Sequence, residues 1–280
     1  MERKKIAIPD FLKMKQEGHK ITMLTAYDFP TACLIDNAGI DMILVGDSVG
    51  NVVLGYDSTI PVTMDEMIHH AKAVNRGTKY AFLVGDMPFM SFNVGVQETI
   101  LNAGRFVKEA GSDAVKMEGG NTEVVKMVKA TVAAGIPVMG HLGLTPQTAT
   151  MLGGLKVQGR SADLAQKILK QAADLEQAGC FGIVLECVPD KLAERITKQL
   201  TIPTIGIGAG SECDGQVLVT HDMLGLYVRF LPKFVKQYVN LSTQINKALD
   251  SYIHEVREGE FPAAEHTFTM DKNELKELDR

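Results

Sequence analysis

Hydrophobic residues recur along the chain in short runs, each preceded by a helix-like stretch and a glycine. Four copies of this pattern begin at Ala38, Ala110, Ala134 and Ala178, and each has glycine at the next position and an aliphatic run soon after. Glycine readily adopts the left-handed conformation that ends a helix, and a short apolar run is typical of a strand buried on both faces. The pattern therefore predicts repeated units of helix, tight turn and buried strand.

The stretches between the predicted strands have helical periodicity. Between residues 96 and 110, apolar residues spaced three and four apart form a single stripe that ends at Gly111. Residues 63–77 begin with Thr63-Met-Asp-Glu66, which has the spacing of a capping box, and end with Gly77. Helices are therefore expected to alternate with the strands.

Eight strands are predicted from these runs. They lie near residues 21–27, 41–46, 81–85, 114–118, 137–141, 182–186, 203–207 and 216–220. Eight strands alternating with helices over 280 residues favour a closed (β/α)8 barrel, the TIM barrel, over an open doubly wound sheet. We expect a single barrel domain across residues 1–280, with a polar C-terminal extension from about residue 240 that forms a solvated flank or an oligomer contact.

Composition and charge narrow the class of protein. With 29 Lys and Arg against 34 Asp and Glu the net charge is −5, and no basic block favours nucleic acid or an anionic membrane. The cysteines form no Cys-x-x-Cys motif, so neither a zinc site nor a disulfide framework is expected; they are Cys33, Cys180, Cys187 and Cys213. No run has transmembrane length, and no apolar region of an export signal follows the charged start. We expect a cytoplasmic protein that acts on small molecules.

Polar and ionisable residues directly follow or end five of the predicted strands. They are Asp47 and Ser48, Asp86, Lys116 and Glu118, His141, and Glu186. Any one of them could be only the N-cap of the next helix. However, neither Asp47 nor Asp86 is followed at once by a helix-like pattern, and Lys116 and Glu118 face the same side of their strand. Because the C-terminal strand ends of a barrel carry its active site, the sequence predicts that these residues form one cluster.

Converging carboxylates without cysteine suit a hard divalent cation, magnesium above all. Magnesium takes few protein carboxylates, so Asp47 and Asp86 are expected as direct ligands, with Glu118 acting through a water. A 2-oxo acid could chelate such a cation, which would stabilise an enolate. Metal-stabilised enolate chemistry is therefore the predicted reaction class.

Eight motifs in order along nearly the whole chain resemble the ketopantoate hydroxymethyltransferase family. They are Met23-Leu-Thr-Ala-Tyr-Asp28, Val45-Gly-Asp-Ser-Val-Gly50, Leu54-Gly-Tyr-Asp-Ser-Thr-Ile-Pro-Val-Thr63, Val84-Gly-Asp-Met-Pro-Phe89, Val115-Lys-Met-Glu-Gly-Gly120, Gly140-His-Leu-Gly-Leu-Thr-Pro-Gln147, Leu185-Glu-Cys-Val-Pro189 and Gly206-Ile-Gly-Ala-Gly210. The resemblance implies a magnesium-dependent TIM barrel that transfers a hydroxymethyl group from 5,10-methylenetetrahydrofolate to 3-methyl-2-oxobutanoate, giving 2-dehydropantoate, in the first committed step of pantothenate biosynthesis. It also implies a homo-oligomer, usually a decamer.

The resemblance further implies a role for each candidate residue. Asp47, Asp86 and Glu118 match the metal site; Asp47, Ser48, Asp86 and Lys116 match the keto-acid contacts; His141 matches a histidine near the substrate. Glu186 matches the proton acceptor, which would remove the hydrogen on carbon 3 while the cation and Lys116 hold the enolate charge.

Other interpretations remain open at this point. Lys116 could form a Schiff base in a metal-free aldolase. A magnesium-dependent carbon–carbon lyase, like the phosphoenolpyruvate and isocitrate lyase type of barrel, would share fold and ion, and a barrel without catalytic function is a further alternative. The glycines of residues 206–210 lack the spacing of a dinucleotide fingerprint and indicate a tight turn, and His69 and His70 are expected at the surface.

Overall fold

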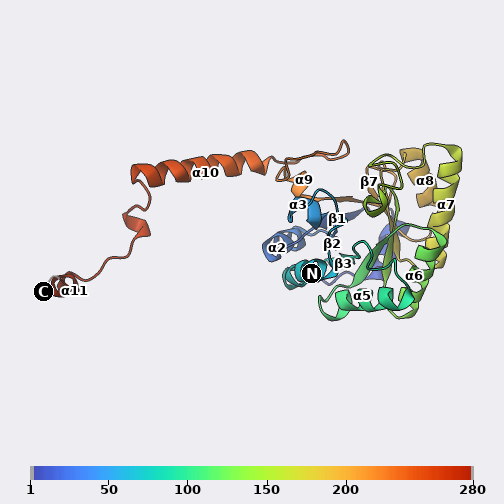
Figure 1. Cartoon of the computed structure of the whole chain (residues 1–280), viewed down its shortest axis with the longest axis horizontal. Helices are drawn as coiled ribbons and strands as arrows, with labels where there is room; N and C mark the ends of the chain where they lie inside the picture. The colour runs from blue at the N-terminus through green and yellow to red at the C-terminus, as the bar shows by residue number, and fades with distance from the viewer. Residues whose placement is uncertain (1–2, 279–280) are drawn as a thin grey trace.

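A closed barrel of eight parallel strands forms the centre of the computed structural model, which describes residues 3–278 (Figure 1). The strands are β1 (Ile21–Thr25), β2 (Met42–Val45), β3 (Phe82–Asp86), β4 (Ala114–Glu118), β5 (Val138–Gly143), β6 (Gly182–Glu186), β7 (Thr204–Ile207) and β8 (Gly215–Leu218). Each strand pairs with the next, and β8 pairs with β1. The predicted TIM barrel is confirmed, and each strand bound lies within about two residues of its predicted position.

Helices surround the barrel, apart from the last two of the chain, which extend away from it (Figure 1). They are α1 (Ile8–Glu17), α2 (Phe29–Ala38), α3 (Val49–Val52), α4 (Met64–Gly77), α5 (Val96–Lys108), α6 (Thr122–Ala133), α7 (Ala162–Gln177), α8 (Asp190–Gln199), α9 (Thr220–Met223), α10 (Leu241–Glu258) and α11 (Lys272–Leu278), with 3-10 turns η1 (Pro146–Thr148) and η2 (Ala264–His266). The capping box at the start of α4 is confirmed, because the Thr63 hydroxyl accepts from the Glu66 N–H and the Glu66 carboxylate accepts from the Thr63 N–H.

The glycines of the four repeated units have left-handed backbone, whereas Gly77 is the last helical residue of α4 and is not left-handed. Their φ angles are 95° at Gly39, 69° at Gly111, 87° at Gly135 and 100° at Gly179. One local expectation is wrong: the short helix α3 follows Asp47 almost at once, with Ser48 at its N-cap position. Its four residues are too few to show a helical period in the sequence.

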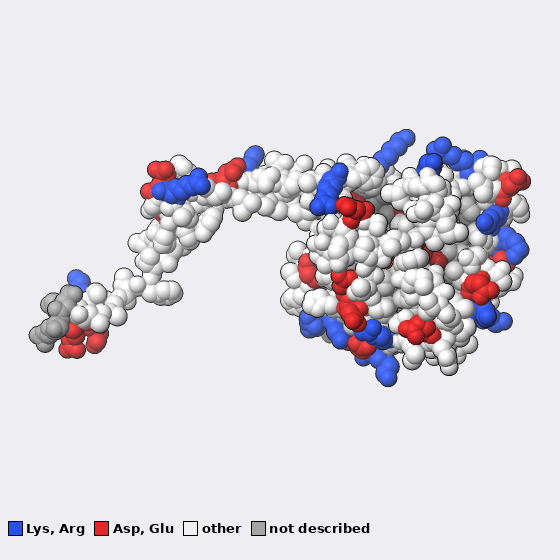
Figure 2. All heavy atoms as spheres, viewed as in Figure 1, with Lys and Arg blue, Asp and Glu red and all other residues white. Residues whose placement is uncertain are grey.

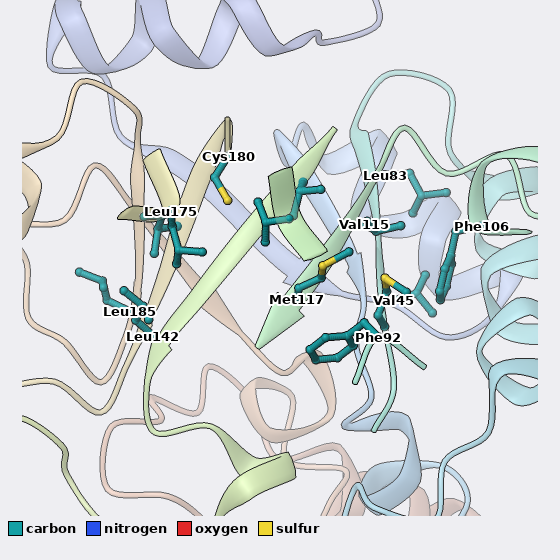
Figure 3. Packing of buried hydrophobic residues seen from close by; sticks show 14 of the residues in the cluster. Val45, Leu83, Phe92, Phe106, Val115, Met117, Leu142, Leu175, Cys180 and Leu185 are labelled. Carbon is teal, nitrogen blue, oxygen red and sulfur yellow. The ribbon is translucent and has the colours of Figure 1, made fainter. Parts of the chain in front are cut away.

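Two hydrophobic layers hold the barrel together. The larger packs the outer faces of the strands against the helices, as Figure 3 shows for Leu83, Val115 and Phe106. Gly85 in β3 lets the ring of Phe106 approach, since a Cβ there would lie 2.2 Å from Phe106 Cδ1. The smaller layer fills the barrel interior, and Phe11 of α1 closes its N-terminal end with its ring centroid 5.4 Å from that of Phe82. Packing on both faces therefore holds in place the strands whose C-terminal ends carry the candidate residues.

Acidic side chains join neighbouring strands at the N-terminal end of the barrel. Asp41, Asp113 and Asp214 directly precede β2, β4 and β8. Their carboxylates accept hydrogen bonds from backbone N–H groups of β1, β3 and β7, at Thr22, Leu83 and Thr204 respectively, with N···O distances of 2.7–2.8 Å. Lys15 also forms an ion pair with Asp214 at 2.7 Å.

The C-terminal part of the chain leaves the barrel. Helix α10 extends away from it, and α11 lies at the far end of this segment (Figure 1). No residue of α10 is buried. The last two residues of the predicted polar end, 279–280, lie outside the described residues. Lys, Arg, Asp and Glu are interspersed over the visible face of the barrel (Figure 2), and no helix among the described residues is long and apolar enough to span a membrane.

Candidate active site

The predicted site residues all lie at the C-terminal end of the barrel, on five consecutive strands. Asp47 and Ser48 follow β2, Asp86 ends β3, Lys116 and Glu118 belong to β4, His141 to β5, and Glu186 ends β6. All except Ser48 and Glu186 are buried, with at most 5% of their surface exposed. The structure therefore brings the predicted residues together at one end of the barrel.

Lys116 lies between the carboxylates of Asp86 and Glu118. Its Nζ lies 2.7 Å from Asp86 Oδ1 and 3.8 Å from Glu118 Oε1. Asp86 also accepts a hydrogen bond from the backbone N–H of Asp47, with an N···O distance of 3.2 Å. The ends of β2, β3 and β4 therefore share one buried polar network.

His141 lies between two carboxylates. Its Nδ1 is 3.2 Å from Glu118 Oε1, and its Nε2 is 3.3 Å from Glu186 Oε2. Lys116 Nζ is also 3.3 Å from Nδ1, but Nδ1 cannot both accept from Lys116 and donate to Glu118. We assign the donation to Glu118, because the carboxylates offset the effects of burial and of the Lys116 charge and raise the pKa of His141 to about 9. This raised pKa favours the imidazolium form, whose Nε2 lies near Glu186 as an ion-pair contact and not as a hydrogen bond of regular geometry.

Burial and neighbouring charges also shift the pKa values of the other buried site residues, not all in the same direction. Burial, together with the charges of Asp86 and Glu118, raises the pKa of Asp47 well above its usual value. Burial likewise raises the pKa of Asp86, although Lys116 opposes the shift. Burial alone would lower the pKa of Lys116, but the neighbouring carboxylates raise it. His141 and Lys116 outweigh burial at Glu118 and lower its pKa.

Two residues that sequence reasoning did not single out belong to the same network. Gln147, in η1, donates through Nε2 to Asp47 Oδ2 at 2.9 Å. Tyr27, beyond β1, has its hydroxyl 2.8 Å from Ser48 Oγ and is fully enclosed. Both stand inside family-like motifs. Gln147 is not ionisable, and Tyr27, at the end of the predicted strand 21–27, carries a phenol rather than the carboxylate, ammonium or imidazole group that marked the ionisable candidates.

The remaining sequence motifs have structural roles. Gly208 and Gly210 have left-handed φ angles of 64° and 86°, and residues 208–209 form a bend after β7. His69 is exposed, as expected for a surface histidine. His70 is not fully at the surface: it is half-buried, and its Nδ1 lies 2.7 Å from the carbonyl oxygen of Tyr27, since its side of α4 packs toward the chain after β1.

Comparison with known protein families gives one match that spans most of the chain. The family model described as ketopantoate hydroxymethyltransferase matches residues 5–264. A protein of Moorella thermoacetica named 3-methyl-2-oxobutanoate hydroxymethyltransferase is 60% identical over 267 residues, covering 95% of this chain and 99% of that protein. A protein of the same name from Heliobacterium modesticaldum is 58% identical over 275 residues, covering 98% of this chain and 99% of that protein.

Solved structures with a similar fold are much more distant in sequence. A phosphoenolpyruvate phosphomutase from Streptomyces platensis has a TM-score of 0.62 at 13% identity, covering 98% of this chain and 96% of its own. A phosphonopyruvate hydrolase solved in complex with oxalate and Mg++ has a TM-score of 0.60 at 14% identity, covering 97% of this chain and 94% of its own. At these identities the likeness shows the barrel fold alone.

Proposed function

The chain belongs to the ketopantoate hydroxymethyltransferase family, and we propose that it transfers a hydroxymethyl group from 5,10-methylenetetrahydrofolate to 3-methyl-2-oxobutanoate. The products are 2-dehydropantoate and tetrahydrofolate, and one water supplies the new hydroxyl group. The observation that carries the proposal is the buried contact network of Asp86, Lys116 and Glu118, which reaches Glu186 through His141. In a member of this family, Lys116 of that network can bind an anionic substrate and Glu186 can accept a proton.

A divalent cation fits the charges of this network. Its acids Asp47, Asp86, Glu118 and Glu186 carry four negative charges when ionised, and Lys116 and His141 carry two positive charges, which leaves 2 − 4 = −2. Among the described residues, no group of three or more His, Cys, Asp or Glu side chains is arranged to hold a metal by itself. Magnesium does not need such a group, because two carboxylates suffice when water and substrate supply the other ligands.

We assign Asp47 and Asp86 as the direct ligands of magnesium, with Glu118 acting through a water. The raised pKa values of Asp47 and Asp86 support this assignment, since burial leaves both groups in need of a positive partner, together with repulsion from Asp86 and Glu118 at Asp47 and from Glu118 at Asp86. When bound, magnesium supplies the positive charge that favours the enolate of a chelated 2-oxo acid. Asp47 and Asp86, which would hold the cation, would also lie beside the keto acid.

Lys116 and Ser48 complete the keto-acid site. Lys116 is protonated and ion-paired with Asp86, so it can offer an N–H to the developing enolate oxygen. The same protonation argues against a Schiff base, because an ammonium group is not a nucleophile. Ser48 is held by the Tyr27 hydroxyl, which orients its side chain for a carboxylate or keto oxygen.

Glu186 is proposed as the base that removes the hydrogen from carbon 3. It is the most accessible acid of the network, with 17% of its side chain exposed, and it therefore borders the space where substrates enter. The His141 imidazolium, 3.3 Å away, can hold one carboxylate oxygen and leave the other free to accept the proton. His141 therefore positions Glu186 near the substrate.

Folate as the one-carbon donor, a cytoplasmic location and a decameric homo-oligomer complete the proposal. Helix α10 supports an oligomer, because it exposes an apolar face made of Ile245, Leu249, Tyr252, Ile253 and Val256, each 43–57% exposed. Contiguous exposed apolar surface of this kind is typical of an interaction site. The lyase alternative rests on fold likeness at low identity, whereas the transferase is supported by family membership over most of the chain.

A direct assay tests the proposed function. The purified protein is incubated with 5,10-methylenetetrahydrofolate and 3-methyl-2-oxobutanoate, and 2-dehydropantoate is measured with magnesium and with a chelator. We expect product with magnesium and none with the chelator. Product in the chelator would remove the cation from the proposal, and no product under either condition would remove the transferase activity itself.

A further inference from the structure

Gln147 joins three components of the site from outside the strands. Its side chain enters the cluster from η1 and is only 4% exposed. Nε2 donates to Asp47 Oδ2 at 2.9 Å and to the Met87 carbonyl oxygen at 3.0 Å, and the backbone N–H donates to Glu118 Oε2 at 3.2 Å. One residue thus holds acids from β2 and β4 and the backbone after β3.

These contacts fix the orientation of the Gln147 amide. Both side-chain acceptors, the Asp47 carboxylate and the Met87 carbonyl, require N–H groups, so a rotated amide would place Oε1 against other oxygens. Oε1 must therefore face away from them. It is buried and has no hydrogen-bond donor among the described residues.

A buried acceptor without a donor is unfavourable unless a bound molecule supplies one. The ionised 2-oxo acid cannot, because its keto and carboxylate groups contain only acceptor oxygens. Water can, and a magnesium ion held by two carboxylates keeps several waters in its coordination sphere. The chemistry of the bound state thus provides the donor that Oε1 lacks.

We propose that Gln147 is a positioning residue of the cation site, which fixes the orientation of Asp47 and accepts, through Oε1, a hydrogen bond from a water that the cation carries. This inference rests on the proposed function, because it requires the cation at Asp47 and Asp86. Residues that orient metal ligands typically change metal affinity by about 10- to 100-fold when they are removed.

Calorimetric titration with Mg²⁺ alone tests the proposal. Gln147→Met keeps a similar length but lacks the amide, so we expect the Kd for Mg²⁺ to rise by about tenfold or more. Turnover should fall at low Mg²⁺ and recover at high Mg²⁺, because Lys116 and Glu186 are unchanged. A residue with a merely structural role would not give a loss that Mg²⁺ reverses.

A matched control lies on the same loop. The side chain of Gln158 donates only to the carbonyl oxygen of Lys156, at 3.0 Å, and its backbone N–H bond to Cys187 is kept in any variant, so Gln158→Met should leave the Kd within about twofold of the wild type. Gln147→Asn, one methylene shorter, keeps a polar turn residue and should also bind Mg²⁺ weakly; it replaces the Met variant if circular dichroism shows that the latter is unfolded. Wild-type affinity in a folded Gln147 variant, or a turnover loss that Mg²⁺ does not reverse, would overturn the proposal. A wild-type protein that neither binds Mg²⁺ nor transfers the group would instead overturn the proposed function.

Discussion

Acidic side chains gather at both ends of the barrel, but their partners differ. At the N-terminal end, Asp41, Asp113 and Asp214 accept hydrogen bonds from backbone N–H groups of the neighbouring strand. At the C-terminal end, Asp47 and Asp86 lie together in the interior, where burial raises the pKa of both carboxyls. The first set has partners within the chain, whereas the second set needs a positive partner in addition to Lys116.

This difference separates stability from chemistry within one fold. A carboxylate that accepts backbone hydrogen bonds holds two strands in register and favours the folded state. A buried carboxylate that faces other carboxylates costs folding free energy unless a cation or substrate joins it. We therefore expect substitutions at the N-terminal end to reduce stability and substitutions at the C-terminal end to reduce function.

The largest expected effect is on proton transfer at Glu186. Glu186→Gln keeps the shape of the side chain but removes the base, so exchange of the carbon 3 hydrogen of 3-methyl-2-oxobutanoate in deuterated water should slow by about 10²- to 10⁴-fold. Proton NMR follows the loss of the methine signal in the presence of magnesium and without folate.

The matched control for this exchange is at the other end of the barrel. Glu176 accepts from the backbone N–H of Thr201 at 2.6 Å, so Glu176→Gln should exchange at the wild-type rate although it is less stable. Wild-type exchange by a metal-binding Glu186→Gln variant would show that another group is the base, with His141 first to be tested because it lies 3.3 Å from Glu186.

A large effect on stability is expected at Asp214. Its carboxylate accepts from Thr204 N and from Lys15 Nζ, and both charged side chains are at least 86% buried. Asp214→Ala leaves the Lys15 charge without its partner and should lower the free energy of unfolding by about 3 kcal/mol. Denaturant unfolding measures it, with Asp250→Ala on exposed α10 as the control that should change stability by less than about 0.5 kcal/mol. Equal stability of the two variants would contradict a structural role for the N-terminal set.

The sequence was sufficient to predict where the barrel strands end, and hence which side chains converge. Buried parallel strands are short apolar runs, so the first ionisable residue after each run marks an end of the barrel. This is why Asp86, Glu118 and Glu186 could be identified without coordinates.

The partners of these residues could not be predicted in the same way. Gln147 reaches the cluster from η1 and Tyr27 from the short segment between β1 and α2, and the path of such segments depends on tertiary packing rather than on a hydrophobic period. Asp41 and Asp113 follow glycine in a repeated Ala-Gly-x-Asp pattern, but their acceptance of N–H groups from β1 and β3 depends on strand stagger. The sequence therefore indicates which residues meet, and the structure shows which acids have partners.

Asp47 tests the acids at the C-terminal end of the barrel, which we expect to affect function rather than stability. Without magnesium, Asp47→Asn should unfold at the wild-type temperature or above it at pH 8, because the variant cannot ionise at a site where burial and the charge of Asp86 raise the pKa of the carboxyl and so disfavour its charged form. With magnesium at about 100 times its Kd, the wild type should gain about 2.7 kcal/mol of stability and the variant almost none. Thermal unfolding with and without magnesium measures both values. An equal gain in the variant would mean that the cation binds elsewhere.

The smallest expected effect concerns Asp222, an acid at the C-terminal end that lies outside the cluster. Burial raises its pKa to about 6, and its Oδ1 has no hydrogen-bond partner among the described residues. Because the folded-state pKa lies above the unfolded value of 3.8, ionisation removes stability as pH rises from 3.8 to about 6.

Asp222→Asn cannot ionise, so the variant and the wild type should be similarly stable below pH 3.8, and the variant should be more stable by about 1–2 kcal/mol above pH 6. Unfolding temperatures across this range measure the difference, with Asp250→Asn on exposed α10 as a control that should show none. A constant difference at all pH values would mean that packing, rather than the charge of an acid without partners, accounts for the effect. A difference that appears only above pH 3.8 would show that ionised Asp222 destabilises the wild type. A buried acid without a partner would then cost stability even outside the proposed site, as we expect for Asp47 and Asp86 without a cation.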